Sequence, residues 1–201
     1  MADQAKILSR EPVRLKDHHP RLQHLLRSLA QRRFVDFTAR HECLLDDLPE
    51  IDDFIYGAHV SLIQIAARDL RLTFKAHFNM LEVAALTARK NGLTRTPEQV
   101  QRSTYDLFRE YTNLVAGAMA KQFQSCGVLA GISLPLATSG FNEVISSDEL
   151  QDQRMVDFWV MRSSDFRFIC SVHLDILRPE VLSLLSVDDI GAEGEGEIEL
   201  L

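Results

Sequence analysis

The chain has 201 residues, of which 46% are hydrophobic and 25% charged, and its formal net charge is -7 at pH 7. This length suits one principal domain with a substantial core, and no window approaches the run of about 18 apolar residues that a membrane-spanning helix needs. The N-terminal sequence also lacks the apolar segment of a secretory signal. We therefore expect a cytoplasmic protein that does not associate with membranes.

The cysteines and the charge distribution limit the binding chemistry. Cys43, Cys126 and Cys170 are widely spaced and form no CxxC motif, which argues against a disulfide framework or a zinc site. Residues 1–40 hold nine basic and four acidic residues, a charge of +5 that leaves -12 for the rest of the chain. Because this acidic remainder repels duplex DNA and no aromatic residues alternate with the arginines, nucleic-acid binding is not expected.

The first predicted element is an N-terminal helix with basic flanks. Pro20 suits the first turn of a helix, and the leucines that follow recur at helical spacing: Leu22, Leu25, Leu26 and Leu29. The next segment, HECLLDDLPEIDDF, is acidic and contains Pro49, which favours a connection or a short helix ahead of the main fold. We interpret residues 1–55 as a basic helical extension and connector.

A β-hairpin and a second helix are predicted next. The run over 60–65 is apolar, residues 67–69 permit a turn, and LRLTFKAHF over 70–78 alternates, which favours two paired strands. MLEVAALTARKNG, residues 80–92, predicts a helix that ends at Asn91-Gly92. Its expected packing side consists of Leu81, Ala84, Ala85 and Ala88.

A longer helix is predicted after a linker that contains Pro97, with its end near Cys126-Gly127. Within it, DLFREYTNLVAG has an apolar side made of Leu107, Phe108, Tyr111, Leu114, Val115, Ala118 and Met119. Opposite lie Asp106, Glu110, Asn113 and Gly117, which share a stripe about 60° wide.

This polar stripe contains residues that an ordinary exposed helix surface would not favour. Asparagine is a mediocre helix former and a glycine costs up to about 1 kcal/mol, so together Asn113 and Gly117 weaken the helix. The stripe therefore indicates a functional surface. Two alternatives remain: Gly117 could accommodate a close crossing by another element, and Asp106 could be an ordinary solvated acid.

The last third of the chain predicts mainly sheet. GISLPLATSG, residues 131–140, contains Pro135, which favours a sheet edge or a strand end. MVDFWVMR and DFRFICSVHLDI flank Ser163-Ser164 as a hairpin, and RPEVLSLL adds a short helix. The fold class is thus α+β, with two or three helices on a largely antiparallel sheet over 56–186, an extra N-terminal helix, and an acidic flexible tail over 187–201.

The string DLFREYTN fits the motif [DS]xxxExxN and, with its surroundings, resembles the CheC, CheX and FliY group of chemotaxis phosphatases. These proteins remove phosphate from the aspartyl phosphate of CheY-like response regulators. The run from Glu110 to Gly117, followed by GISLP and Gly140, is similar to the CheX pattern of helix, turn and strand. CheC-type proteins carry a second ExxN pair, but here Glu82 is followed by Ala85. The resemblance therefore implies a CheX-like fold with a single site and a homodimer joined through sheet edges.

The resemblance also implies a role for each stripe residue. Asn113 would position the attacking water and Glu110 would pair with a lysine of the phosphorylated receiver domain, while Asp106 and Gly117 would serve docking. The receiver would supply the phosphorylated aspartate, Mg²⁺ and the lysine, so no cofactor or metal of the chain's own is expected. Two non-catalytic alternatives are an adaptor that binds a receiver or flagellar-switch partner through the same helix, and a structural component close to FliN.

The histidines suggest no further site. His18, His19 and His24 have no acid or cysteine partner at ligand spacing, so they predict no metal centre. His59, His77 and His173 lie in or beside the predicted strands. Their positions are compatible with solvent-facing sites.

Overall fold

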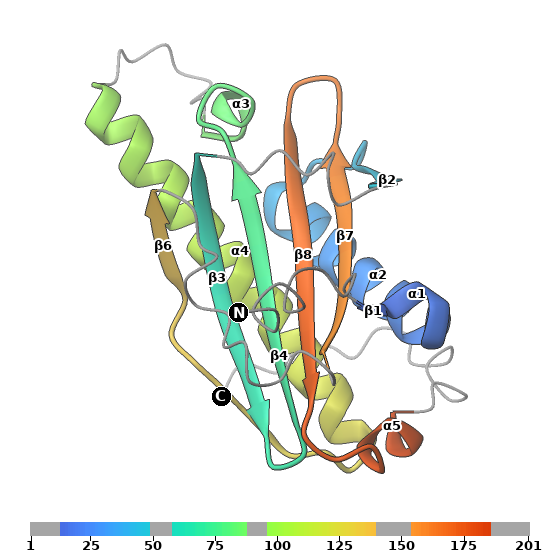
Figure 1. Cartoon of the computed structure of the whole chain (residues 1–201). Coiled ribbons are helices and arrows are strands. Elements are labelled where there is room, and N and C mark those ends of the chain that lie inside the picture. The colour runs from blue at the N-terminus through green and yellow to red at the C-terminus, as the bar shows by residue number, and fades with distance from the viewer. Residues whose placement is uncertain (1–12, 49–57, 88–95, 140–153, 186–201) are drawn as a thin grey trace, which may run out of the picture.

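The computed structural model of the chain describes residues 13–48, 58–87, 96–139 and 154–185. These residues form one sheet with two long helices behind it in an α+β arrangement (Figure 1). The strands are β1 (Val13–Arg14), β2 (Leu44–Asp47), β3 (His59–Ala67), β4 (Leu70–Phe78), β5 (Ala130–Ile132), β6 (Leu136–Ser139), β7 (Arg154–Arg162) and β8 (Arg167–Ile176). The helices are α1 (Leu15–His18), α2 (Pro20–Thr38), α3 (Ala84–Thr87), α4 (Pro97–Ser125) and α5 (Val181–Leu184).

The sheet is largely antiparallel, as predicted. Its strand order is β1-β7-β8-β4-β3-β5, with β2 also paired to β7 and β6 also paired to β3. Among the described pairs only β1 and β7 run parallel. Both predicted hairpins are confirmed, with Ile63 opposite Phe74 in β3–β4 and Trp159 opposite Cys170 in β7–β8.

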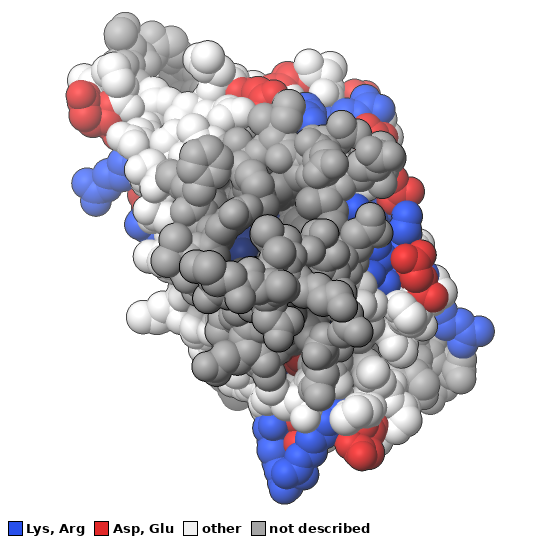
Figure 2. Space-filling model, viewed as in Figure 1, with Lys and Arg blue, Asp and Glu red and all other residues white. Residues whose placement is uncertain are grey.

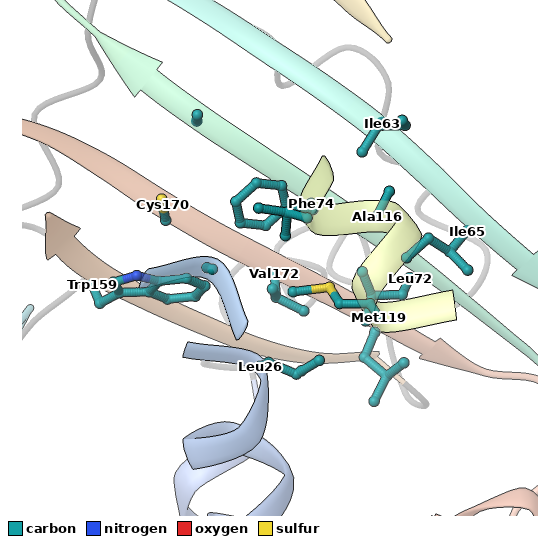
Figure 3. Packing of buried hydrophobic residues seen from close by; sticks show 14 of the residues in the cluster. Leu26, Ile63, Ile65, Leu72, Phe74, Ala116, Met119, Trp159, Cys170 and Val172 are labelled. Atoms are coloured by element: carbon teal, nitrogen blue, oxygen red, sulfur yellow. The ribbon is translucent and has the colours of Figure 1, made fainter. Parts of the chain in front are cut away.

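The core lies between the sheet and the two long helices. Odd-numbered β3 residues and even-numbered β4 and β8 residues point toward the helices, as the period of two requires. Figure 3 shows Phe74 and Trp159 from the sheet converging with Leu26 of α2 and Met119 of α4. Phe34 on α2 and Tyr111 on α4 pack edge to face with their ring centroids 5.4 Å apart. The N-terminal helix therefore shares one core with the sheet.

Residues 44–47 form strand β2, although the sequence favoured a connection or a short helix there. The strand pairs antiparallel with β7, which offers an otherwise unfilled row of backbone donors and acceptors at this position. Asp46 forms an ion pair with Arg162, and Asp47 forms one with Arg27 of α2. Its acidic residues, which suggested a loop, are thus matched by basic partners on the sheet and on α2.

The helix predicted over 80–92 begins later than expected and packs through other residues. Only Ala84–Thr87 is helical among the described residues, and 88–95 lie outside them. Leu81 is 93% exposed, whereas Val83 is buried. The Glu82 carbonyl accepts a bond from the Arg167 amide, and the Leu86 amide donates to Val83 rather than to Glu82. The hydrogen bond from the Arg167 amide therefore replaces the one from Leu86 that would have extended the helix toward its N-terminus.

Helix α4 has a defined start and end. The Thr96 hydroxyl accepts from the Gln99 amide and the Gln99 side chain accepts from the Thr96 amide, a capping box. Pro97, which we placed in the preceding linker, is instead the first residue of the helix, where its missing N–H costs nothing. The predicted end is confirmed, since the helix stops at Ser125 and Gly127 has a φ of 79°.

The GISLP segment lies at the edge formed by β5 and β6. Both strands pair with β3, and Pro135 falls between them, as its inability to donate to a ladder predicts. Ser133 bridges the interruption, because its amide donates to the Gln64 carbonyl and its hydroxyl accepts from the Gln64 amide. Gly140 and the predicted acidic tail lie outside the described residues.

Candidate functional site

The polar stripe lies on the solvent side of α4. Asp106, Glu110, Asn113 and Gly117 are all exposed. The opposite side is buried against the sheet and α2 through Phe108, Tyr111, Val115, Met119 and Phe123. Glu110 and Asn113, one turn apart, thus present a carboxylate and a carboxamide to solvent from a rigid, well-anchored element.

Gly117 leaves an open patch at the end of this stripe. A Cβ built on Gly117 would have no heavy atom within 4 Å, and the residue has ordinary helical geometry. In the described part of the chain, no strand or helix crosses closely enough to require glycine here. Among the described residues, therefore, no packing contact explains Gly117, whose surface is bare.

The acid at the start of the stripe is held in a small network that the sequence analysis missed. Arg109 Nη1 lies 3.4 Å from Asp106 Oδ1, and the guanidinium carbon lies 5.9 Å from the centroid of the Tyr105 ring. The Tyr105 hydroxyl is 2.8 Å from Nδ1 of His59 on β3. Helical spacing could have shown the contacts of Arg109 with Asp106 and Tyr105, but the contact with His59 requires the tertiary structure.

The neutral form of His59 suits this position. Partial burial lowers the pKa of His59 below its usual 6.5, because a charged imidazole loses hydration there. A neutral ring can exchange one hydrogen bond with the Tyr105 hydroxyl, with the tautomer deciding which group donates. Tyr105 is thereby tied to the sheet through its hydroxyl.

The earlier Glu82 and Ala85 do not form a second site of the same kind. The Glu82 carboxylate accepts from the Asn79 side chain at 3.1 Å and lies 3.6 Å from Arg167. Ala85 has no side-chain amide, and its carbonyl accepts from Arg40 at 3.0 Å. The described residues thus contain one Glu-x-x-Asn pair, Glu110 and Asn113 on α4.

The remaining titratable groups of interest are mostly buried. His77 is 4% exposed, so the interpretation of a solvent-facing site is wrong for it, whereas His173 is half-buried. Burial and the nearby Lys75 lower the pKa of each to about 3. Cys43 and Cys170 are buried free thiols and Cys126 is a half-buried one, and burial raises the pKa of Cys43 to about 11.

The described ranges contain neither a cluster of metal ligands nor a membrane-spanning helix. Within them, no group of three or more His, Cys, Asp or Glu residues is placed to hold a metal ion. None of the helices there combines the length and apolar character needed to span a lipid bilayer. Figure 2 shows Lys and Arg side chains beside Asp and Glu along the margin of the viewed face, so charges of both signs are mixed there.

Comparison with known proteins identifies the fold. No protein-family model matches the chain, and no curated protein matches its sequence. A chain of the CheX–CheY–BeF3–Mg²⁺ complex from Borrelia burgdorferi matches with a TM-score of 0.60 and 14% identity, covering 78% of this chain and 97% of that one. A chemotactic CheC-like protein from Shewanella oneidensis matches with a TM-score of 0.54 and 20% identity, covering 80% of this chain and 98% of that one.

A third solved structure agrees with these two. The chemotaxis protein CheX from Desulfovibrio desulfuricans matches with a TM-score of 0.55 and 12% identity, covering 77% of this chain and 99% of that one. Each matched structure is thus covered almost end to end. The chain has a CheX-like fold, as its motif predicted.

Proposed function

We propose that the protein is a phosphatase that accelerates hydrolysis of the aspartyl phosphate of a CheY-like receiver domain. The observation that carries the proposal is the joint exposure of Glu110 and Asn113 on α4, beside the bare Gly117, in a CheX-like fold. One structure with this fold is in complex with CheY, BeF3 and Mg²⁺. That complex supports a receiver domain as the partner class.

The proposed chemistry divides the work between the two proteins. Hydrolysis of an acyl phosphate needs a water in line with the scissile bond and cations to balance the phosphoryl charge. The receiver would supply the phosphorylated aspartate, Mg²⁺ and a lysine. Asn113 would hold the water, because a carboxamide can both donate and accept without adding negative charge beside the phosphate. Glu110 would pair with the lysine and orient the inserted helix.

The remaining stripe residues would serve docking. Gly117 leaves room for the partner backbone, since nothing in the described structure covers it. Asp106, one turn before Glu110, would contribute to orientation. No metal or cofactor of this chain's own enters the scheme. A cytoplasmic location and a homodimer joined through sheet edges are further parts of the proposal.

Replacing Asn113 with alanine tests the catalytic claim. We expect phosphate release from a phosphorylated receiver with Mg²⁺ to fall by about 10²–10³ in kcat, the usual effect of losing one positioning or transition-state hydrogen bond. Time courses of radiolabelled phosphoreceiver with wild type, Asn113→Ala and no added protein measure this effect. Gln101→Ala is a matched control, because it removes an exposed amide from the same helix outside the stripe.

Two outcomes would contradict the phosphatase assignment. One is a wild-type protein that leaves the receiver's own rate of dephosphorylation unchanged, and the other is an Asn113→Ala variant as active as wild type. If the wild type binds the receiver without accelerating hydrolysis, and Glu110→Arg abolishes that binding, the protein is a non-catalytic adaptor that uses the same helix.

A further inference from the structure

We propose that Arg109 is a specificity-determining residue that makes this surface selective for the phosphorylated form of its receiver. The inference deepens the proposed function and rests on it. It assigns to Arg109, which lies outside the DxxxExxN motif, an interaction with the anionic phosphoryl group of the partner. The argument depends on where Arg109 is held and on the charge around it.

Arg109 is held at the margin of the polar stripe by contacts on two sides. Its side chain is 42% exposed and lies 3.4 Å from Asp106, one turn earlier on the helix. An exposed ion pair of this kind contributes little by itself. Its guanidinium also lies over the Tyr105 ring, with 5.9 Å between the guanidinium carbon and the ring centroid. Arg109 is thus restrained while much of its surface stays in solvent.

The Tyr105 ring is in turn fixed to the sheet. Its hydroxyl is 2.8 Å from Nδ1 of His59, and its ring meets those of His59 and Phe78 edge to face, with centroids 5.5 and 6.2 Å apart. A tyrosine packed on several sides offers a stable surface for a cation. Tyr105 is therefore a positioning residue, and Arg109 is the group that reaches outward.

Helical geometry places Arg109 beside the proposed water-positioning amide. Arg109 precedes Asn113 by four residues, so the two side chains leave the helix about 40° apart around its axis and one turn apart along it. A long arginine side chain spans this separation, and its planar fork matches phosphoryl oxygens. In the structure Arg109 contacts Asp106 and Tyr105 in the preceding turn, so its flexible side chain would swing toward the following turn to meet a phosphoryl group located over Asn113.

The negative charge of the polar stripe explains why a positively charged residue is needed beside it. Asp106 and Glu110 bring two carboxylates toward a partner whose phosphorylated site is itself anionic. Like charges at short range oppose association. In our scheme Glu110 is matched by the partner's lysine, and Arg109 supplies the positive charge that Asp106 and the phosphoryl group require. An unphosphorylated receiver offers no such anion, so it gains less from Arg109.

The test compares binding to two forms of one receiver, with full-length protein and Mg²⁺. The probes are the receiver alone and the receiver with BeF3, which stands in for the phosphoryl group. We expect wild type to prefer the BeF3 form and Arg109→Ala to reduce that preference about tenfold, mainly by weakening binding to the BeF3 form. Arg109→Lys should give an intermediate preference, because it keeps the charge without the planar fork.

Tyr105 and a distant arginine complete the set of variants. Tyr105→Leu should lower the preference for the BeF3 form, whereas Tyr105→Phe, which retains the ring, should keep most of that preference. Arg68→Ala is the matched control, since Arg68 is an exposed arginine 3.8 Å from Asp69 in the turn between β3 and β4. This control should bind both forms as wild type does. Circular dichroism and thermal unfolding show whether each variant is folded.

The outcomes separate this inference from the proposed function. Equal weakening of both receiver forms by Arg109→Ala, or an unchanged preference, overturns the role of Arg109 while Asn113-dependent hydrolysis stands. Selective binding that depends on Arg109 in a protein without phosphatase activity overturns the catalytic claim and supports the role of Arg109. A wild type that binds neither form overturns both.

Discussion

His77 is buried, although its place in an alternating strand suggests an exposed side chain. Within an alternating strand it reads as a polar, outward residue, yet its side chain is 4% exposed and its Nε2 lies 3.3 Å from the Ser171 hydroxyl. Burial, then the charges of Lys75 and His173, lower the pKa of His77 to about 3. His173 is lowered to about 3 mainly by burial as well. Both rings are therefore neutral in the folded protein near pH 7.

The difference between the pKa of these histidines in the folded and in the unfolded chain predicts that acid lowers the stability of the fold. An unfolded histidine titrates near pH 6.5, so between about pH 3 and pH 6.5 the unfolded chain binds more protons than the folded one. The stabilisation is fully present above about pH 6.5 and is lost as the pH falls toward 3. At pH 5.5, protonation of each histidine in the unfolded chain should lower the free energy of unfolding by about 1 kcal/mol relative to its value above pH 7.

Urea unfolding at pH 7.5, 6.5 and 5.5 measures this dependence. His77→Gln should flatten the slope over this range, because glutamine does not titrate and can still bond to Ser171. His24→Gln, the same replacement at an exposed histidine, is the control for the change of residue type. An equally steep slope in His77→Gln would mean that His77 does not contribute to the pH dependence.

At the scale of an element, α4 combines an anchored side with a surface that is poorer in helix-forming residues. Its capping box, its glycine-terminated end and its buried aromatic residues fix the helix on β3 and α2. Tertiary packing of this kind supplies most helical stability in proteins. The helix can therefore retain an exposed asparagine and glycine that intrinsic propensity disfavours.

Two substitutions of Gly117 test helix stability and partner binding separately. Gly117→Ala should raise the unfolding free energy by up to about 1 kcal/mol, because the added Cβ meets nothing within 4 Å. Gly117→Leu should also fold normally but lower kcat/KM toward the phosphorylated receiver by at least about tenfold, since its side chain occupies the docking space. Thermal unfolding and phosphate release are measured together. Wild-type kcat/KM in Gly117→Leu would show that no partner approaches this patch.

At the scale of the whole molecule, a buried ion pair joins the N-terminal helix to a strand far along the chain. Arg27 Nε on α2 donates to Asp157 on β7 at 2.7 Å, and their side chains are 15% and 5% exposed. The same guanidinium donates to the Phe158 carbonyl at 3.1 Å and lies over the Trp159 ring. Gln23 donates a further bond to Asp157 at 2.8 Å.

Removing one partner of this pair should destabilise the entire fold. Arg27→Ala should lower the unfolding free energy by about 3 kcal/mol, because Asp157 would remain buried without its counter-charge. The double replacement Arg27→Met and Asp157→Leu should cost less than the single one, since no uncompensated charge is left. Urea unfolding of the three proteins measures both values. A loss under about 1 kcal/mol in Arg27→Ala would contradict the prediction.

Much of the fold and the outline of the candidate site follow from local patterns. Alternation predicted β4, β7 and β8, because side chains of a strand point to opposite faces in turn, and a continuous apolar run predicted β3. Helical periodicity placed Glu110 and Asn113 on one exposed line, because residues three and four apart share a helix face. The motif and the GISLP segment then indicated the CheX-like fold, which structural comparison confirms.

The features that local patterns missed depend on contacts between distant segments. Strand β2 forms because β7 offers a partner more than a hundred residues away, and the helix after β4 begins late because the Arg167 amide occupies the Glu82 carbonyl. Likewise, the open space at Gly117 and the contact between Tyr105 and His59 exist only once α4 lies on the sheet. The sequence by itself determined which residues share a strand or helix face, since that depends on backbone geometry alone. Only the tertiary structure decided which faces are covered, because burial and pairing depend on every segment that reaches the same place.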